Sequence, residues 1–166
     1  FECGQFLREN LQQVGLFIST EAADFVFRQT DGQPYLVWLT GYCLTERYNE
    51  AVDALDTIDP LFLTEDVRSV WRQDRFQARA VSKLFQPLVA YSERIDPLAP
   101  RILRYIATDP APPSTTRVQN RFGGASQIRR NRISEILIDL DSSTLLRQQN
   151  EEWRIAIPLM RNYLRR

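Results

Sequence analysis

Apolar residues in the first half of the chain recur every three or four positions, which is the spacing of one face of an α-helix. The first such run lies within 5–14 and ends at Gly15. A second begins after Ser19, a residue type that often caps the first turn of a helix, and extends to about Gln29. We therefore expect two helices, separated by a break at Gly15.

The next apolar runs are longer and are divided by proline and by capping residues. Pro34 suits the first turn of a third helix, expected to reach about Arg47, because a first-turn N–H has no helical partner to lose. The segment 64–66 (Thr-Glu-Asp) marks the start of a long helix to residue 85, and Pro87 is expected to kink or divide it. Residues 1–96 are thus expected to form an all-helical bundle.

The pattern shortens after the Asp96-Pro97 pair. One helix is predicted within 97–110, a short one from about Ser114 to the Gly123-Gly124 pair, and a third within 125–141. The third carries apolar residues at the i, i+3, i+4, i+7 spacing of one buried face, namely Ile133, Ile136, Leu137 and Leu140.

A strand pattern follows these three helices. Two strand-like runs, TLLRQQ and WRIAI, flank the turn NEE and predict a β-hairpin at about 144–157, and PLMRNYLRR predicts a terminal helix. Three helices and a hairpin are the parts of a winged helix-turn-helix. The fold class is therefore predicted to be mainly α, with a helical bundle over 1–96 and a winged helix-turn-helix with a β-hairpin wing over 97–166.

The residue types that the chain lacks exclude much of enzymology. There is no histidine, so Ser-His-Asp and Cys-His triads and most zinc sites are excluded. There is no phosphate-binding glycine loop, and the one lysine, Lys83, has no glycine beside it. Cys3 and Cys43 are interpreted as small buried side chains. We assign no catalytic residue, metal or cofactor to this chain alone and expect no enzymatic activity from it.

Length and hydrophobicity limit where the chain can reside. With 166 residues, of which 43% are hydrophobic, it can build one compact domain or two small ones. No apolar run approaches the ~20 residues that cross a bilayer, and the first residues lack the features of a signal peptide. We therefore expect a soluble, cytoplasmic protein with no membrane partner.

Charge is distributed unequally along the chain, although the formal total is zero. Residues 101–166 contain 12 arginines and 6 acidic residues, a net charge of +6, so residues 1–100 carry −6. This asymmetry indicates two units with different partners or two units that attract each other.

The stretch TDGQPYLVWLTGYCL, followed further on by WRIAIPLMRNYLRR, resembles the C-terminal part of a P-loop ATPase of the AAA+/STAND type. In that family a helical lid carries a T-x-G-x-P-x-x-L segment, matched here by Thr30, Gly32, Pro34 and Val37, and a winged helix follows the lid. The resemblance covers nearly the whole chain. It implies that Gly32, Gln33 and Pro34 form a nucleotide-sensing turn. Taken alone, the same tripeptide is typical of an ordinary turn that ends one helix and starts another.

The resemblance implies a non-catalytic lid and winged helix of an ATP- or ADP-dependent switch in signal transduction. Its main partner would be a P-loop core of the same protein that precedes Phe1, so this chain would be a fragment, and ATP or ADP would bind only to the full-length protein. Relatives often have a histidine near the end of the wing that touches a nucleotide phosphate. Here Ile157 precedes Pro158 at that place, so this contact is absent.

The third predicted helix of the winged helix supports a second hypothesis, DNA binding. Its outer face is expected to present positions 127, 130, 131 and 134, and Arg129, Arg130, Asn131 and Arg132 are residue types that contact base edges and phosphates. The same residues could instead contact the ATPase core, with the winged helix acting as a clamp. A third hypothesis is a protein-interaction scaffold that uses aromatic side chains, and homo-oligomers are compatible with all three.

Overall fold

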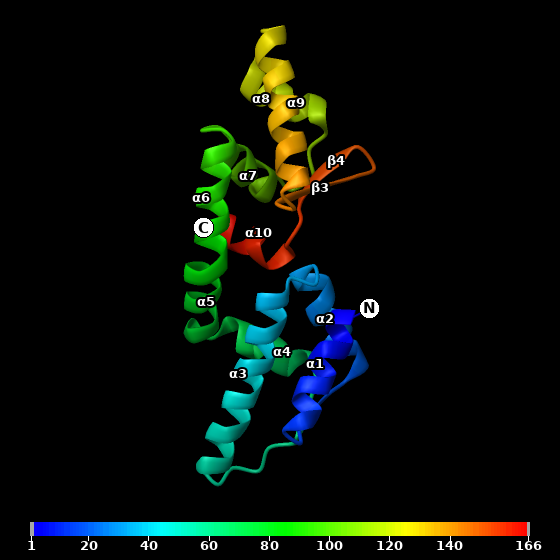
Figure 1. Ribbon diagram of the computed structural model, residues 1–166, viewed down its shortest axis with the longest axis vertical. Helices are drawn as coiled ribbons and strands as arrows, with labels where there is room; N and C mark the ends of the chain where they lie inside the picture. The colour runs from blue at the N-terminus through cyan, green and yellow to red at the C-terminus, as the bar shows by residue number, and fades with distance from the viewer. Residues whose placement is uncertain (1, 166) are drawn as a thin grey trace. The chain divides into compact units, whose positions relative to one another are not determined.

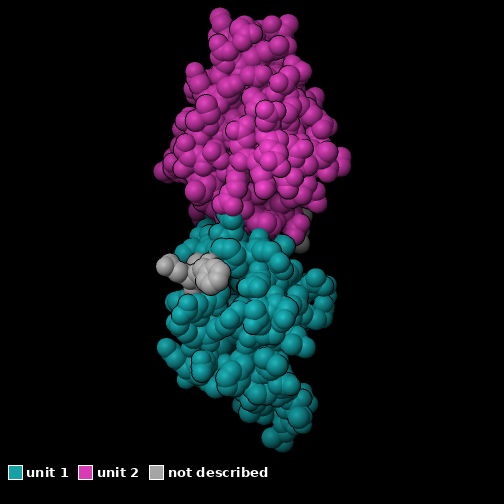
Figure 2. Space-filling view, turned by 90° about the vertical axis from the view of Figure 1, so that its right-hand side faces the viewer, with its two compact units in different colours: residues 1–84 teal, residues 85–166 magenta. Residues whose placement is uncertain are grey.

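The computed structural model describes the backbone of residues 2–165 and the side chains of residues 4–165, and it is mainly helical (Figure 1). The expectation for Cys3 therefore lies outside the described side chains. The chain forms two compact units, residues 1–84 and 85–166, which Figure 2 colours separately. Each unit has its own buried core and is described by itself.

The first unit contains helices that start and stop largely where capping residues stand. Its elements in chain order are α1 (Glu2–Gln13), β1 (Phe17–Ile18), α2 (Thr20–Thr30), α3 (Pro34–Asp53), β2 (Leu61–Phe62), α4 (Thr64–Arg72) and α5 (Asp74–Ala80). The Ser19 hydroxyl accepts a hydrogen bond from the backbone N–H of Ala22 at 3.1 Å and so caps α2 as expected. Gly15 ends the first run with a φ of 75°.

A short parallel pair of strands corrects the all-helical expectation for this unit. β1 pairs with β2 in the register Phe17 to Leu61 and Ile18 to Phe62. The backbone N–H of Phe17 donates to the carbonyl of Pro60 at 2.8 Å, and that of Ser19 donates to the carbonyl of Phe62 at 3.0 Å. Strands of two residues are too short to show an alternating pattern of apolar and polar residues, so no pattern predicts them.

The long helix expected from residue 64 is divided earlier than Pro87. Gln73 adopts an extended conformation (φ −68°, ψ 138°) and separates α4 from α5. The π-helical turn η1 (Val81–Phe85) then leads into α6 (Gln86–Ile95), and Pro87 lies in the first turn of α6. The chain therefore turns at Gln73, although glutamine is not one of the residue types that usually break helices.

The second unit starts before α6, not after it. Its further elements are α7 (Ala99–Thr108), α8 (Thr115–Gly123), α9 (Gln127–Ser142), β3 (Leu146–Gln149), β4 (Glu152–Ile155) and α10 (Pro158–Leu164). We expected the division at residue 96, whereas the compact units divide between Leu84 and Phe85. The difference arises because α6 packs on α7 and α9, and because the rings of Phe85 and Tyr163 stack with centroids 5.6 Å apart.

The predicted hairpin is present. β3 and β4 pair antiparallel from Leu146 opposite Ile155 to Gln149 opposite Glu152. Asn150 and Glu151 form the turn with φ values of 52° and 64°. The hairpin is anchored to the start of α8, because the indole N–H of Trp153 donates to the Thr115 hydroxyl at 2.9 Å.

The buried face of α9 is also as predicted, with Ile133, Ile136, Leu137 and Leu140 all buried. α10 closes the unit at the end of α7. Both Arg161 and Arg165 donate to the backbone carbonyl of Ala107, at 3.2 and 2.7 Å. Cations at this place complement the partial negative charge of a helix C-terminus.

Candidate functional site

The turn at Gly32-Gln33-Pro34 has a backbone that favours glycine. Asp31 ends α2 in the left-handed region (φ 52°), and Gly32 follows with a φ of 67°. The backbone N–H of Gln33 donates to the carbonyl of Thr30 at 3.0 Å, while the Gln33 side chain accepts from the N–H of Leu36 at 3.2 Å. Gln33 thus caps α3, and Pro34 occupies its first turn. Two consecutive left-handed residues reverse the chain between α2 and α3.

Burial changes abruptly just after this turn. Gly32 and Gln33 are half-buried and Pro34 is exposed. Leu36 and Leu39 are fully buried, whereas Trp38, between them, is 50% exposed. Burial and exposure therefore alternate within a few residues. The turn is accessible within its own unit and is held by a buried face directly behind it.

The exposed face of α3 carries a row of aromatic rings. Trp38 lies 6.0 Å from Tyr35 and 5.4 Å from Tyr42, measured between ring centroids. The guanidinium of Arg79 lies over the ring of Tyr42, 4.8 Å from its centroid. Trp38 stacks on Tyr42 and is tilted against Tyr35, so neighbouring rings of the row contact one another at helical spacing.

A polar cluster continues from this row into the unit. The Tyr42 hydroxyl donates to the Glu46 carboxylate, and Arg75 lies 3.6 Å from the same carboxylate. Cys43 is fully buried beside them, as expected for a small core side chain. Burial raises the pKa of its thiol, and the negative charge of Glu46 raises it further. A thiol held in its neutral form is a poor nucleophile.

The four residues proposed for DNA contact on α9 do not form one free surface. Arg132 binds Asp96 at 3.0 Å and Glu135 at 2.9 Å, and these two hydrogen-bonded carboxylates raise the pKa of its guanidinium. Arg130 donates to the carbonyl of Gly124 at 2.8 Å. Asn131 accepts from Gln127 at 2.9 Å. Among the described residues, only Arg129 of these four has a side chain without a hydrogen bond or ion pair.

The outer face expected for this helix also needs correction. Positions 127 and 131 are exposed, but Arg130 and Ser134 are half-buried, because α8 packs beside them. The side-chain amide of Gln119 on α8 donates to the Ser134 hydroxyl at 2.7 Å. Half of the predicted reading face is therefore used to hold α8 and α9 together.

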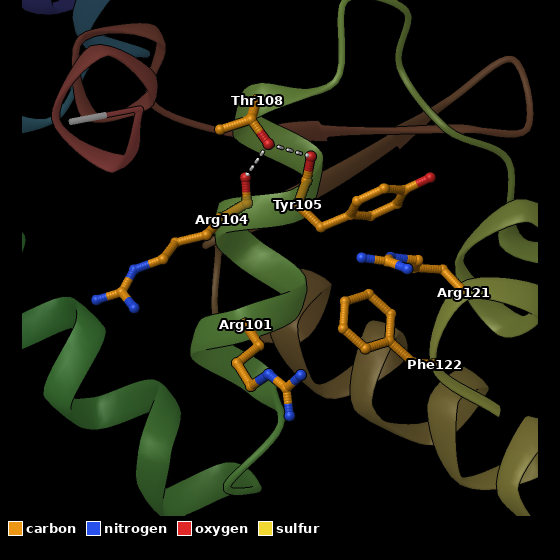
Figure 3. Close-up of a pocket in the computed structure, with 6 residues that line it drawn as sticks. All are labelled: Arg101, Arg104, Tyr105, Thr108, Arg121 and Phe122. Atoms are coloured by element: carbon orange, nitrogen blue, oxygen red, sulfur yellow. Dashed lines mark hydrogen bonds between the residues drawn. The ribbon is translucent and has the colours of Figure 1, made fainter.

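Sequence reasoning missed an arginine-lined hollow of about 360 Å³ between α7 and α8. Figure 3 shows its lining, which consists of Arg101, Arg104, Tyr105, Thr108, Arg121 and Phe122. The rings of Tyr105 and Phe122 meet edge to face with centroids 5.6 Å apart. We name this feature the α7–α8 hollow. The available signal was the spacing of 101, 104 and 108 along one polar face of α7.

Two other hollows are lined by fewer arginines. One of about 370 Å³ is lined by Gly4, Gln5, Arg8, Thr20 and Asp24. The Nε of Arg8 is buried there without a hydrogen-bond partner among the described residues. Another, of about 190 Å³, is mostly apolar and includes Arg161, whose pKa is lowered by burial and by the neighbouring cations Arg165 and Arg154.

Within the described residues, no group of three or more histidine, cysteine or acidic side chains is placed to hold a metal ion. In the same part of the chain, no helix is both long enough and apolar enough to cross a membrane. We find no match between this chain and any protein-family model, curated protein or solved structure in our comparisons. We therefore infer function from the geometry of the Gly32-Gln33-Pro34 turn and of the α7–α8 hollow.

Proposed function

We propose that the chain is the non-catalytic lid and winged-helix region of an ATP- or ADP-dependent switch. In this proposal residues of the first unit form the lid, and the Gly32-Gln33-Pro34 turn senses the nucleotide. The chain contains no Walker A motif, so the phosphates would be held by a P-loop core that is not in the printed sequence. The chain itself would contribute no catalytic group.

The observation that carries this proposal is the geometry of the turn. Gly32 has a positive φ, and Pro34 is exposed at the first turn of α3. Directly behind them Leu36 and Leu39 are fully buried. A turn that responds to a ligand has to be reachable and must also be coupled to a rigid element, and this turn meets both requirements.

The second unit supports the winged-helix part of the proposal. The helices α7, α8 and α9 precede an antiparallel hairpin, in the order of a winged helix-turn-helix. On α9, Arg132 is paired with carboxylates and Arg130 with a backbone carbonyl. A helix whose cations are already engaged is less suited to reading DNA bases, which favours a clamp over a DNA reader at this helix.

The proposal is tested in the protein encoded by the complete reading frame, by titration calorimetry with ADP and ATP. Pro34→Ala should weaken nucleotide binding or alter the preference between ADP and ATP. The melting temperature of the 166-residue chain should stay nearly unchanged, because a first-turn proline contributes under about 1 kcal/mol of stability. Pro87→Ala is the matched control, since Pro87 also lies in a first helical turn.

Two results would contradict the proposal. The first is a complete reading frame that encodes no P-loop core. The second is equal nucleotide affinity in the wild type, Pro34→Ala and Pro87→Ala, which would leave the turn as a helix boundary only.

A further inference from the structure

We propose that the α7–α8 hollow binds the phosphate backbone of nucleic acid without reading its base sequence. This site is distinct from α9, the helix that the sequence pattern suggested for DNA contact. It is also separate from the proposed nucleotide-sensing turn, because every residue that lines the hollow belongs to the second unit and the turn belongs to the first.

The first argument is that the cations of the hollow are unpaired. Most of the arginines described in the second unit have partners. The five whose side chains have no hydrogen bond or ion pair within the described part of the chain are Arg94, Arg101, Arg104, Arg121 and Arg129. Three of these five line the same hollow, and no acidic side chain lines it. Guanidinium groups that lack carboxylate partners are available to bind an external anion.

The second argument is that the walls of the hollow are held in place. Tyr105 on α7 and Phe122 on α8 are both half-buried and pack edge to face. The Thr108 hydroxyl donates to the carbonyls of Arg104 and Tyr105, at 2.8 and 3.1 Å, and so is turned back onto its own helix (Figure 3). The aromatic pair fixes the spacing of the two helices, and the arginines extend from a stable base.

The directions of the arginine side chains decide the class of ligand. In Figure 3, Arg101 and Arg121 extend toward the space beside Phe122, whereas Arg104 leaves α7 on the other side. The three guanidinium groups therefore do not converge on one point, as a pocket for a single phosphate or a mononucleotide would require. Cations spread over an open surface suit a chain of phosphates. The lining contains no asparagine, glutamine or acidic side chain, the residue types that read adenine and cytosine edges.

The charge of the unit favours the same ligand. The second unit contains 13 arginines and 8 acidic residues, a formal charge of +5, and no lysine. A positive unit attracts polyanions over distances of about one Debye length, roughly 8 Å at physiological salt. Local unpaired cations and the charge of the unit thus act in the same direction.

The test is fluorescence anisotropy of the 166-residue chain with a labelled duplex of about 20 base pairs, at several salt concentrations. If the three arginines neutralise three phosphates, log K should fall with log salt at a slope of about −2.7, or about 40-fold between 50 and 200 mM. Two duplexes of unrelated sequence should bind equally within about twofold, because phosphate contacts carry no sequence information. A single strand of the same length shows whether the backbone alone is sufficient.

The decisive comparison uses two variants with the same change in charge. Arg101→Gln/Arg104→Gln/Arg121→Gln should bring the salt slope close to zero. Arg129→Gln/Arg130→Gln/Arg132→Gln should keep a slope of about −2.7. Melting temperatures of both variants show whether each chain remains folded, and the slope is compared only between folded chains.

Several outcomes would overturn the proposal. They are no binding by the wild type at low salt, an unchanged slope in the variant of the hollow, and a larger loss in the α9 variant. The nucleic-acid assignment would also be overturned if polyglutamate of equal charge displaced the duplex as well as unlabelled DNA does, since the surface would then be one for acidic peptides. ADP that binds the chain and needs the same three arginines would likewise assign the hollow to a mononucleotide.

Discussion

The indole N–H of Trp71 on α4 donates to the hydroxyl oxygen of Thr40 on α3 across 2.9 Å, and both side chains are buried. The same hydroxyl donates to the carbonyl of Leu36 one turn earlier, at 2.7 Å. The Thr40 oxygen thus acts as acceptor and donor at once. This bond fixes the register between α3 and α4, since sliding either helix would leave a buried indole N–H without a partner.

Thr40→Val tests this relationship. Valine has nearly the shape of threonine but cannot accept the indole N–H, so the variant should lose about 1–3 kcal/mol of unfolding free energy. Urea denaturation measures the loss. Thr45→Val is the control on the same helix, because the Thr45 hydroxyl is half-buried and, within the described part of the chain, bonds only to the carbonyl of Gly41. Equal losses in the two variants would show that the Trp71 bond contributes nothing.

Gly123→Ala tests the close approach of α8 and α9. A Cβ at Gly123 would lie 3.1 Å from the backbone nitrogen of Arg130 and 3.2 Å from its Cα, and a backbone cannot move aside as a side chain can. We expect a loss of about 1–3 kcal/mol, seen as a lower melting temperature. Gly4→Ala in α1 is the control, because a Cβ there meets no described atom within 4 Å. It should be neutral or should stabilise the helix by up to about 1 kcal/mol. A higher melting temperature in Gly123→Ala would refute the close approach.

The buried thiol predicts how stability depends on alkaline pH. Burial and Glu46 raise the pKa of Cys43 in the folded state, although Arg75 and Arg79 act in the opposite direction. The folded state therefore binds the thiol proton more tightly than the unfolded state does. The resulting stability is fully present below about pH 8.5 and is lost as the pH rises through the folded-state pKa.

Urea unfolding of Cys43→Ala, in a Cys3→Ser background, measures this contribution. The wild-type thiol should lose its advantage over alanine as the pH rises above about 8.5, because only the wild type must bury or titrate a thiolate. The Cys3→Ser parent with Cys43 intact is the reference at each pH. A constant difference from pH 7 to 10 would mean that the folded and unfolded thiols titrate alike.

Trp38 should account for nearly all quenching of tryptophan fluorescence by acrylamide. It is 50% exposed, whereas Trp71 and Trp153 are 6% and 4% exposed. Trp38→Phe should therefore leave an emission that acrylamide hardly quenches, while the ring stacking with Tyr42 is retained. Trp153→Phe, made in parallel, should lower the total emission but leave the intensity that acrylamide quenches unchanged, and a large change in that intensity would contradict the burial of that indole.

Helix starts could be predicted from the sequence because they are encoded locally. Ser19, Ser114 and Ser126 each accept a backbone N–H at the start of a helix. The end of α3 was predicted near Arg47, six residues before its observed end at Asp53. The helix stops where Leu55 adopts a φ of 60°. A glycine at this position would have predicted the helix end, whereas a leucine does not.

The candidate sites differ in how far the sequence could reveal them. The positive φ of Gly32 agrees with its residue type, because a glycine between two helices commonly adopts this conformation. The pairing of Arg132 with Asp96 joins residues far apart in the sequence, and no local pattern encodes such a pair. No local pattern encodes the α7–α8 hollow either, because it needs Arg101 and Arg121 from two helices whose relative placement depends on packing.

The parallel pair of β1 and β2 has a consequence for the order in which the first unit opens. It joins Phe17 to Leu61, so α2, α3 and the turn between them lie inside a closed loop of backbone. Closing a loop of this length has an entropic cost, and the packing of the enclosed helices offsets that cost. The amide hydrogens of Phe17 and Ser19 should thus exchange with solvent only in openings that also release α2 or α3. Hydrogen exchange at these two short strands therefore reports whether the helices that they enclose are packed.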